Sequence, residues 1–106
     1  MAWLLLILAG FFEVAFATFL KLSNNFTNIK YSIVFAACAI ISFLLLNKSI
    51  QTIPIGTAYG VWTGIGAAGA AIVGMIYFGE GTDFWRVFFI TLLVISIVGL
   101  KYFAPE

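Results

Sequence analysis

An acidic residue in the middle of an apolar segment is the feature of this sequence best suited to chemistry. Glu13 is the only charged residue between Ala2 and Leu20, and the other acidic residues lie in a polar turn or at the chain end: Glu80, Asp83 and Glu106. Removal from water favours the neutral form of a carboxyl group, whereas a nearby cation favours the ionised form. Every basic residue lies at the end of an apolar segment. Glu13 is therefore a candidate site for a proton or a cationic substrate; the alternative is an acid tolerated in a helix contact.

Small, aromatic and hydroxyl side chains are expected near this carboxyl group. If the segment is helical, Gly10, Glu13 and Ala17 share one stripe, and Phe16 follows three residues after Glu13. Gly10 leaves space beside the carboxylate, and Phe16 can either offer its ring face to a cation or simply pack. Ser42 is the hydroxyl residue in the middle of the second apolar segment. Its hydroxyl can bond to the carboxylate or to a carbonyl of its own helix, and the sequence does not decide between them.

The third apolar segment combines a polar aromatic pair with glycines. Tyr59, Trp62 and Thr63 are spaced i, i+3 and i+4, so they neighbour one another on a helix surface. A tyrosine hydroxyl and an indole N–H need hydrogen-bond partners in an apolar environment, and Glu13 is the expected acceptor; plain packing is the alternative. The sequence Gly64-Ile65-Gly66 predicts a point where the helix can bend. Small residues also recur every fourth position, a pattern typical of closely packed membrane helices: Gly56, Gly60, Gly64 and Ala68.

The composition indicates that these residues lie in a membrane. The chain has 106 residues, of which 64% are hydrophobic and 8% are charged, with one cysteine and no histidine. Soluble domains contain about 25% charged residues. The composition therefore excludes a soluble enzyme, a nucleic-acid-binding protein and a disordered chain. An intrachain disulfide is excluded, a metal site is improbable and no cofactor is expected. We predict a non-enzymatic integral membrane protein.

The length suits four membrane crossings, because one helical span uses about 20 residues. We predict an all-α fold with a single transmembrane domain over residues 1–106, and with spans at about 2–20, 31–47, 55–78 and 84–103. A signal peptide is the alternative for the first span, but the basic start is missing and Glu13 interrupts the apolar core. Pro54 marks the start of the third helix. Short loops favour an up-down-up-down bundle of antiparallel neighbours.

The fourth span and the distribution of basic residues indicate how copies of the chain could assemble in the membrane. The fourth span has no ionisable residue between Arg86 and Lys101, so we expect an assembly helix, or alternatively a helix that faces lipid. Lys48 and Lys101 lie on the face of the amino terminus, and the remaining basic residues lie on the opposite face: Lys21, Lys30 and Arg86. The positive-inside rule needs an imbalance, so both orientations are plausible. Oppositely inserted copies can form an antiparallel dimer, and inverted halves recur in alternating-access transporters.

Motifs spread over the whole chain resemble those of the small multidrug resistance family of proton-coupled exporters. They are Glu13 in a Phe-Glu-Val context, Lys21, Phe26-Thr27, Ser42-Phe43, the sequence Pro54-Ile55-Gly56-Thr57-Ala58-Tyr59 and the sequence Val61-Trp62-Thr63-Gly64-Ile65-Gly66. The resemblance implies a dual-topology antiparallel homodimer in the inner (plasma) membrane. Protons and cations would compete for two Glu13 side chains in one site. That site would be lined by Gly10, Phe16, Ser42, Tyr59, Trp62 and Thr63. The third span would bend at Gly64 and Gly66, and the fourth would hold the dimer together.

The resemblance also narrows the range of expected substrates. Gly10, Ser42 and the sequence Gly99-Leu100-Lys101 are similar to the guanidinium-exporting branch of that family. The branch usually has tryptophan where this chain has Phe16, and a phenylalanine cannot donate a hydrogen bond to the glutamate. A looser site would admit bulkier cations. We expect export of guanidinium or guanidinyl compounds, with quaternary ammonium compounds as the close alternative.

Two other classes of membrane protein remain as less favoured alternatives. A proton-conducting subunit of a rotary ring also needs one buried carboxyl group, but it needs neither four spans nor the Tyr59 and Trp62 pair. A non-transporting structural subunit gives no reason for Glu13. The sequence does not distinguish a homodimer from a two-gene heterodimer, and it does not identify the physiological cation or the proton-to-substrate ratio.

Overall fold

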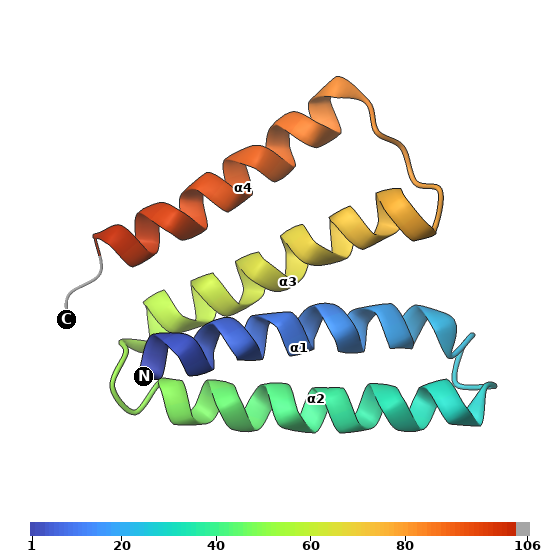
Figure 1. Cartoon of the computed structure of the whole chain (residues 1–106), viewed down its shortest axis with the longest axis horizontal. Helices are drawn as coiled ribbons and strands as arrows, with labels where there is room; N and C mark the ends of the chain where they lie inside the picture. The colour runs from blue at the N-terminus through green and yellow to red at the C-terminus, as the bar shows by residue number, and fades with distance from the viewer. Residues whose placement is uncertain (104–106) are drawn as a thin grey trace.

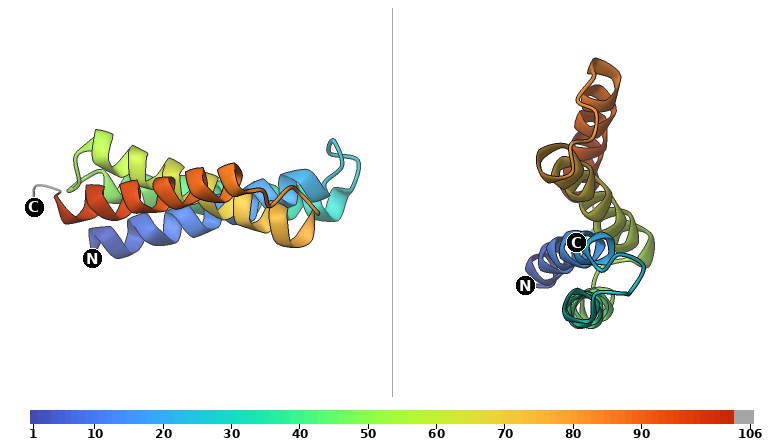
Figure 2. Two further views of the ribbon diagram at one scale, coloured as in Figure 1. Left: turned by 90° about the horizontal axis from the view of Figure 1, so that it is seen from above. Right: turned by 90° about the vertical axis from the view of Figure 1, so that its right-hand side faces the viewer.

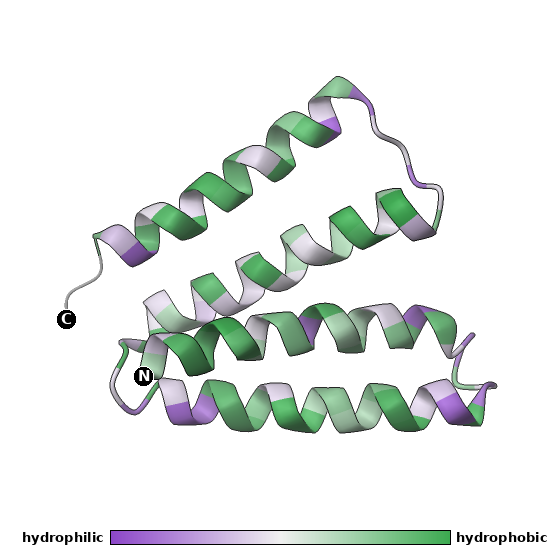
Figure 3. Ribbon diagram, in the orientation of Figure 1, coloured by the Kyte–Doolittle hydropathy of each residue, from purple (hydrophilic) through white to green (hydrophobic). Residues whose placement is uncertain are grey.

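The computed structural model describes residues 1–103, so Glu106 lies outside the described residues. Four helices are present in this part of the chain (Figure 1): α1 (Ala2–Leu22), α2 (Ile29–Ser49), α3 (Ile55–Tyr77) and α4 (Phe84–Tyr102). All four are long and apolar enough to cross a membrane, and hydrophilic residues gather mainly at the loops and helix ends (Figure 3). The prediction of an all-α membrane fold is confirmed. The helix ends differ from the predicted spans by up to two residues.

Local sequence accounts for where the helices begin. The Asn28 side chain accepts a hydrogen bond from the Tyr31 N–H at the start of α2, and Asp83 does the same for Arg86 at the start of α4. Such side chains satisfy N–H groups that have no partner within the helix. Pro54, which directly precedes α3, has no N–H to leave unpaired. The short polar loops then reverse the chain direction, so that consecutive helices run antiparallel (Figure 1).

The chain direction alternates as the short loops predicted, but α3 does not pack chiefly on its predecessor α2. α1 packs against both α2 and α3, whereas α4 packs along α3 and diverges from α1 and α2 (Figures 1 and 2). The resulting order across the molecule is α2, α1, α3, α4, and its shortest extent is only 17 Å. A cation–ring contact also links α4 back to α1, where the Lys101 Nζ lies 4.7 Å from the centre of the Trp3 ring. A loop length constrains chain direction but not which helix becomes the neighbour.

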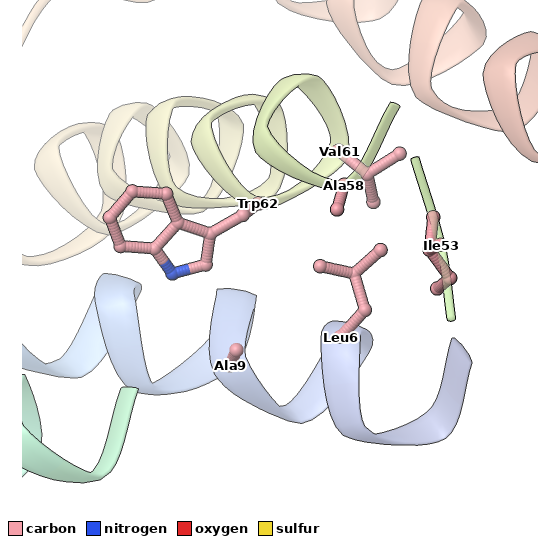
Figure 4. Close-up of a cluster of buried hydrophobic side chains, with 6 residues drawn as sticks. All are labelled: Leu6, Ala9, Ile53, Ala58, Val61 and Trp62. Carbon is pink, nitrogen blue, oxygen red and sulfur yellow. The ribbon is translucent and has the colours of Figure 1, made fainter. Parts of the chain in front are cut away.

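The core lies where α1 meets the beginning of α3. Its buried members are mostly aliphatic and come from α1, α3 and the turn before α3 (Figure 4): Leu6, Ala9, Ile53, Ala58, Val61 and Trp62. No residue of α4 is buried. α2 and α4 contribute only partly buried side chains to this core, among them Leu45 and Ile97.

Ser42 connects α1, α2 and α3 inside the packed region. Its side chain is fully buried, and its hydroxyl donates a 2.7 Å hydrogen bond to the Ala9 carbonyl on α1. The same oxygen accepts a 2.9 Å hydrogen bond from the Trp62 indole N–H on α3. The sequence suggested a bond to Glu13 or to a carbonyl within α2, and the structure has neither. The hydroxyl instead forms one hydrogen bond with the Ala9 carbonyl of α1 and one with the Trp62 N–H of α3. Such pairing is favourable where no water is available.

We predict that Ser42→Ala lowers the stability of the protein in detergent by about 1–2 kcal/mol, because it leaves the buried Trp62 N–H without an acceptor. The matched control is Ser32→Ala, whose hydroxyl bonds to the Asn28 carbonyl one turn earlier in the chain and connects no second helix. Unfolding followed by circular dichroism measures both variants. Equal effects of the two substitutions would contradict the role given to Ser42.

Candidate substrate site around Glu13

The Glu13 carboxyl group lies between α1 and the middle of α3. The residue is partly buried, and its Oε1 atom is buried without a hydrogen-bond partner within the part of the chain that the structure describes. The carboxyl group faces the backbone of Gly66 so closely that a side chain at position 66 would collide with it. A buried polar atom without a partner is unfavourable in a membrane interior. This oxygen therefore has an unused capacity to bind a proton or a cation.

Trp62 and Tyr59 lie next to each other but do not complete the expected contact with Glu13. Their ring centres are 5.5 Å apart, and Trp62 is buried while Tyr59 is 55% exposed. The indole N–H, for which Glu13 was the expected acceptor, bonds to Ser42 instead. Ser42 bonds to the carbonyl of Ala9, one helical turn before Glu13 in α1, so the indole N–H is directed to that level of α1 rather than to the carboxyl group.

Phe16 belongs to an aromatic cluster between α1 and α2. Its ring packs edge-on against Phe35, with centres 5.9 Å apart, and stacks on Phe43 at 6.1 Å. Phe43 in turn lies 5.3 Å from Trp62. In this conformation Phe16 therefore packs against neighbouring rings, which was one of the two alternatives for this residue. The rings are successive neighbours from Phe16 through Phe43 and Trp62 to Tyr59.

Gly10 and Thr63 have local roles that differ from those expected. A Cβ atom at position 10 would lie 2.7 Å from the Ile65 side chain, so Gly10 permits the close approach of α1 and α3 rather than leaving space at the carboxyl group. The Thr63 hydroxyl donates a 2.6 Å hydrogen bond to the Tyr59 carbonyl within α3. Thr63 is exposed on the same surface as Tyr59. These two positions adjoin the site without contacting Glu13 in the described chain.

Three glycines in the first half of α3 face different neighbours. Gly60 and Gly64 face α4, where a Cβ atom would lie 3.3 Å from Leu100 and 2.8 Å from Ile97 respectively. Gly66 faces Glu13 of α1. The helix runs without interruption from Ile55 to Tyr77, so bending at Gly64 and Gly66 stays a prediction. Small residues on both sides let α3 lie close to α1 and to α4 at the same depth.

Neighbouring charges do not neutralise Glu13. Arg86 forms an ion pair with Glu80 at 2.5 Å, outside the apolar layer, and this is the only ion pair among residues 1–103. The Lys21 Nζ lies 5.1 Å from the centre of the Phe78 ring at the ends of α1 and α3. Arg86 and Lys21 thus lie at the helix ends, as expected for the basic side chains.

A separate cavity of about 390 Å³ lies between α1, α3 and α4. Its lining is apolar and includes Phe11, Val14 and Ile97, but none of the residues predicted for the substrate site. A cation would find no counter-charge or hydrogen-bond acceptor among these side chains. The cavity is therefore not the candidate site.

Sequence reasoning missed two groups at this site. The Ala9 carbonyl anchors Ser42, and no residue type reveals which main-chain oxygen will accept such a bond. Gly66 was singled out for flexibility, whereas the structure gives it a contact with the carboxyl group. The glycine-rich composition of this segment signalled close packing, but it did not reveal which residue each glycine would face.

Comparisons with known proteins show the family of this chain. The family model described as Small Multidrug Resistance protein matches residues 1–93. A protein named "Guanidinium exporter" from Citrobacter freundii is 45% identical over 101 residues, which cover 95% of this chain and 96% of that protein. The protein of the same name from Escherichia coli (strain K12) is 42% identical over the same shares of both chains. The chain therefore belongs to the small multidrug resistance family and is a multi-pass inner-membrane protein.

Proposed function

We propose that this protein is a proton-coupled antiporter that exports small cationic compounds, with guanidinium or guanidinyl compounds as its substrates. The observation that carries the proposal is the Glu13 carboxyl group in the apolar part of α1, which has a buried oxygen without a partner among residues 1–103. The names of the two relatives support guanidinium as the cation. The activity is transport rather than catalysis.

The coupling follows from competition for one group. A carboxyl group withheld from water avoids an unpaired charge by binding a proton, whereas an arriving cation stabilises the ionised form. Guanidinium is planar and can donate two parallel hydrogen bonds to a carboxylate. Binding of the cation thus releases the proton, and binding of a proton releases the cation. The exchange moves the two ligands in opposite directions if the site opens alternately to the two sides; bending of α3 at Gly64 and Gly66 would provide this change.

A quaternary ammonium cation is the second candidate substrate, and a series of neighbouring aromatic rings that begins at Phe16, three residues after Glu13, favours it. Such a cation donates no hydrogen bonds, but it is attracted to the faces of aromatic rings. Phe16, Phe43, Trp62 and Tyr59 form a continuous series of neighbouring rings. Phe16 occupies the position at which an indole would offer a donor to the glutamate, so the site keeps a more apolar lining.

We further propose that the transporting unit is an antiparallel homodimer. A single chain is only 17 Å thick in its shortest direction, and its Tyr59 and Thr63 lie exposed beside the candidate site. α4 has no buried residue and packs along one helix. A second copy would cover these surfaces and would bring a second Glu13 to the site. The near balance of basic residues between the two faces favours the inverted arrangement.

Glu13→Gln is expected to abolish export, because it keeps the shape of the side chain but removes the group that binds protons and cations. Transport by proteoliposomes that carry an imposed proton gradient measures this effect, with guanidinium and a tetraalkylammonium assayed side by side. The matched control is Asp83→Asn, which removes a carboxylate outside the apolar layer and keeps a side chain that caps α4 equally well. Proton-driven export by Glu13→Gln would overturn the proposal.

Single cysteines are expected to be labelled from both sides of the membrane if the dimer is antiparallel. The background is Cys38→Ser, since Cys38 is the single native cysteine. Thr27→Cys probes the α1–α2 loop and avoids Asn25, whose φ of 60° disfavours most side chains. Gln51→Cys probes the opposite end of the molecule. Labelling of each site from one side alone would indicate a single orientation.

Phe16→Trp is expected to raise the ratio of guanidinium transport to tetraalkylammonium transport. An indole N–H can bond to the carboxylate and fix its position, and a hydrogen bond to a charged group contributes about 1.5–3 kcal/mol. The larger ring also removes space that a tetraalkylammonium requires. The measurement compares both substrates in the wild type and in the variant. An unchanged or lower ratio would mean that Phe16 only packs against Phe35 and Phe43.

A further inference from the structure

Gly66 is the residue of α3 that lies directly against the Glu13 carboxyl group. A Cβ atom at position 66 would collide with the Cδ, Oε1 and Cγ atoms of Glu13, all of which belong to the end of that side chain. The colliding Oε1 is also the buried oxygen that lacks a hydrogen-bond partner. The main chain of Gly66 is therefore one wall of the space that the carboxyl group occupies.

We propose that Gly66 is a positioning residue for substrate binding, which lets the Glu13 carboxyl group rest on the backbone of α3. This inference rests on the proposed function, because it concerns how the same carboxyl group meets its cation. The absence of a side chain at position 66 sets how close the carboxyl group lies to α3. A methyl group there would push the carboxyl group away from α3 and move the point at which a cation is bound.

The other glycines of α3 do not share this role. Gly64, only two residues earlier, faces Ile97 of α4, and Gly69 faces Val14. Gly56 has no atom within 4 Å of the position that a Cβ would take. Position 66 is thus the one glycine of α3 whose space is limited by the Glu13 carboxyl group. Each of the others offers a control in which a methyl group meets a different neighbour or none.

The role proposed for Gly66 differs from flexibility. If Gly66 served only to let α3 bend, the effect of Gly66→Ala would resemble that of Gly64→Ala, and the length of the side chain at position 13 would not matter. If Gly66 positions the carboxyl group, the loss caused by Gly66→Ala depends on residue 13. Aspartate has one methylene fewer than glutamate, so Glu13→Asp withdraws the carboxyl group from position 66.

The experiment is a double-mutant cycle with Glu13→Asp, Gly66→Ala and the combined variant. Binding of guanidinium and of tetrapropylammonium is measured by titration calorimetry on the purified full-length protein. We expect Gly66→Ala to weaken binding by about tenfold or more, which corresponds to about 1.4 kcal/mol. In the Glu13→Asp background the same substitution should weaken binding less than about threefold. Gly56→Ala should leave binding unchanged, and any loss in Gly64→Ala should be the same with either residue at position 13.

Each outcome decides the question. Wild-type binding in Gly66→Ala, or an equal loss with Glu13 and with Glu13→Asp, would overturn the inference. If Gly66→Ala does not assemble, recovery of assembly in the combined variant supports a collision with the Glu13 side chain, and failure of recovery overturns it. A wild-type protein that binds neither cation would instead contradict the proposed function, so the two failures are distinguishable.

Discussion

A carboxyl group inside an apolar layer must either bind a proton or meet a positive charge, and this requirement governs how the rest of the molecule is arranged. Glu13 is on α1, the helix that packs against two others, so α2 and α3 can place groups beside it. The side chains that α2 and α3 bring to this depth are rings, glycine and a hydroxyl that is already paired. None of them is a cation. The chain thus surrounds its acid without neutralising it.

Close helix packing makes that arrangement possible. Gly10 and Gly66 allow α1 and α3 to approach from both sides, and Gly64 lets α4 lie on the other face of α3. In lipid, the association of helices depends on such packing because apolar surface gains little by leaving the hydrocarbon. The Ser42 hydroxyl makes this packing more specific, because its two hydrogen bonds fix α2 relative to α1 and α3.

Composition and periodicity were sufficient to predict four membrane helices and to select Glu13, because the absence of charge elsewhere in the spans leaves few alternatives. The same reasoning failed for Ser42, whose partner is a main-chain carbonyl that belongs to a different helix. It also failed for the position of α3, which packs mainly on α1 rather than on its predecessor α2, since a short turn is compatible with several neighbours. Residue types reveal which groups require partners. The partners themselves depend on helix positions that only the three-dimensional arrangement provides.

The exposed surface of α4 has a consequence for how the protein behaves on dilution. Because α4 has no buried residue within one chain, the apolar surface that it would lose to a partner is covered by lipid chains when the copies separate, so separation costs little hydrophobic free energy. If α4 joins two copies, the fraction of paired chains depends on the ratio of protein to lipid rather than on the concentration in water. Added lipid would then separate the copies, although each would keep the packing of α1 against α2 and α3.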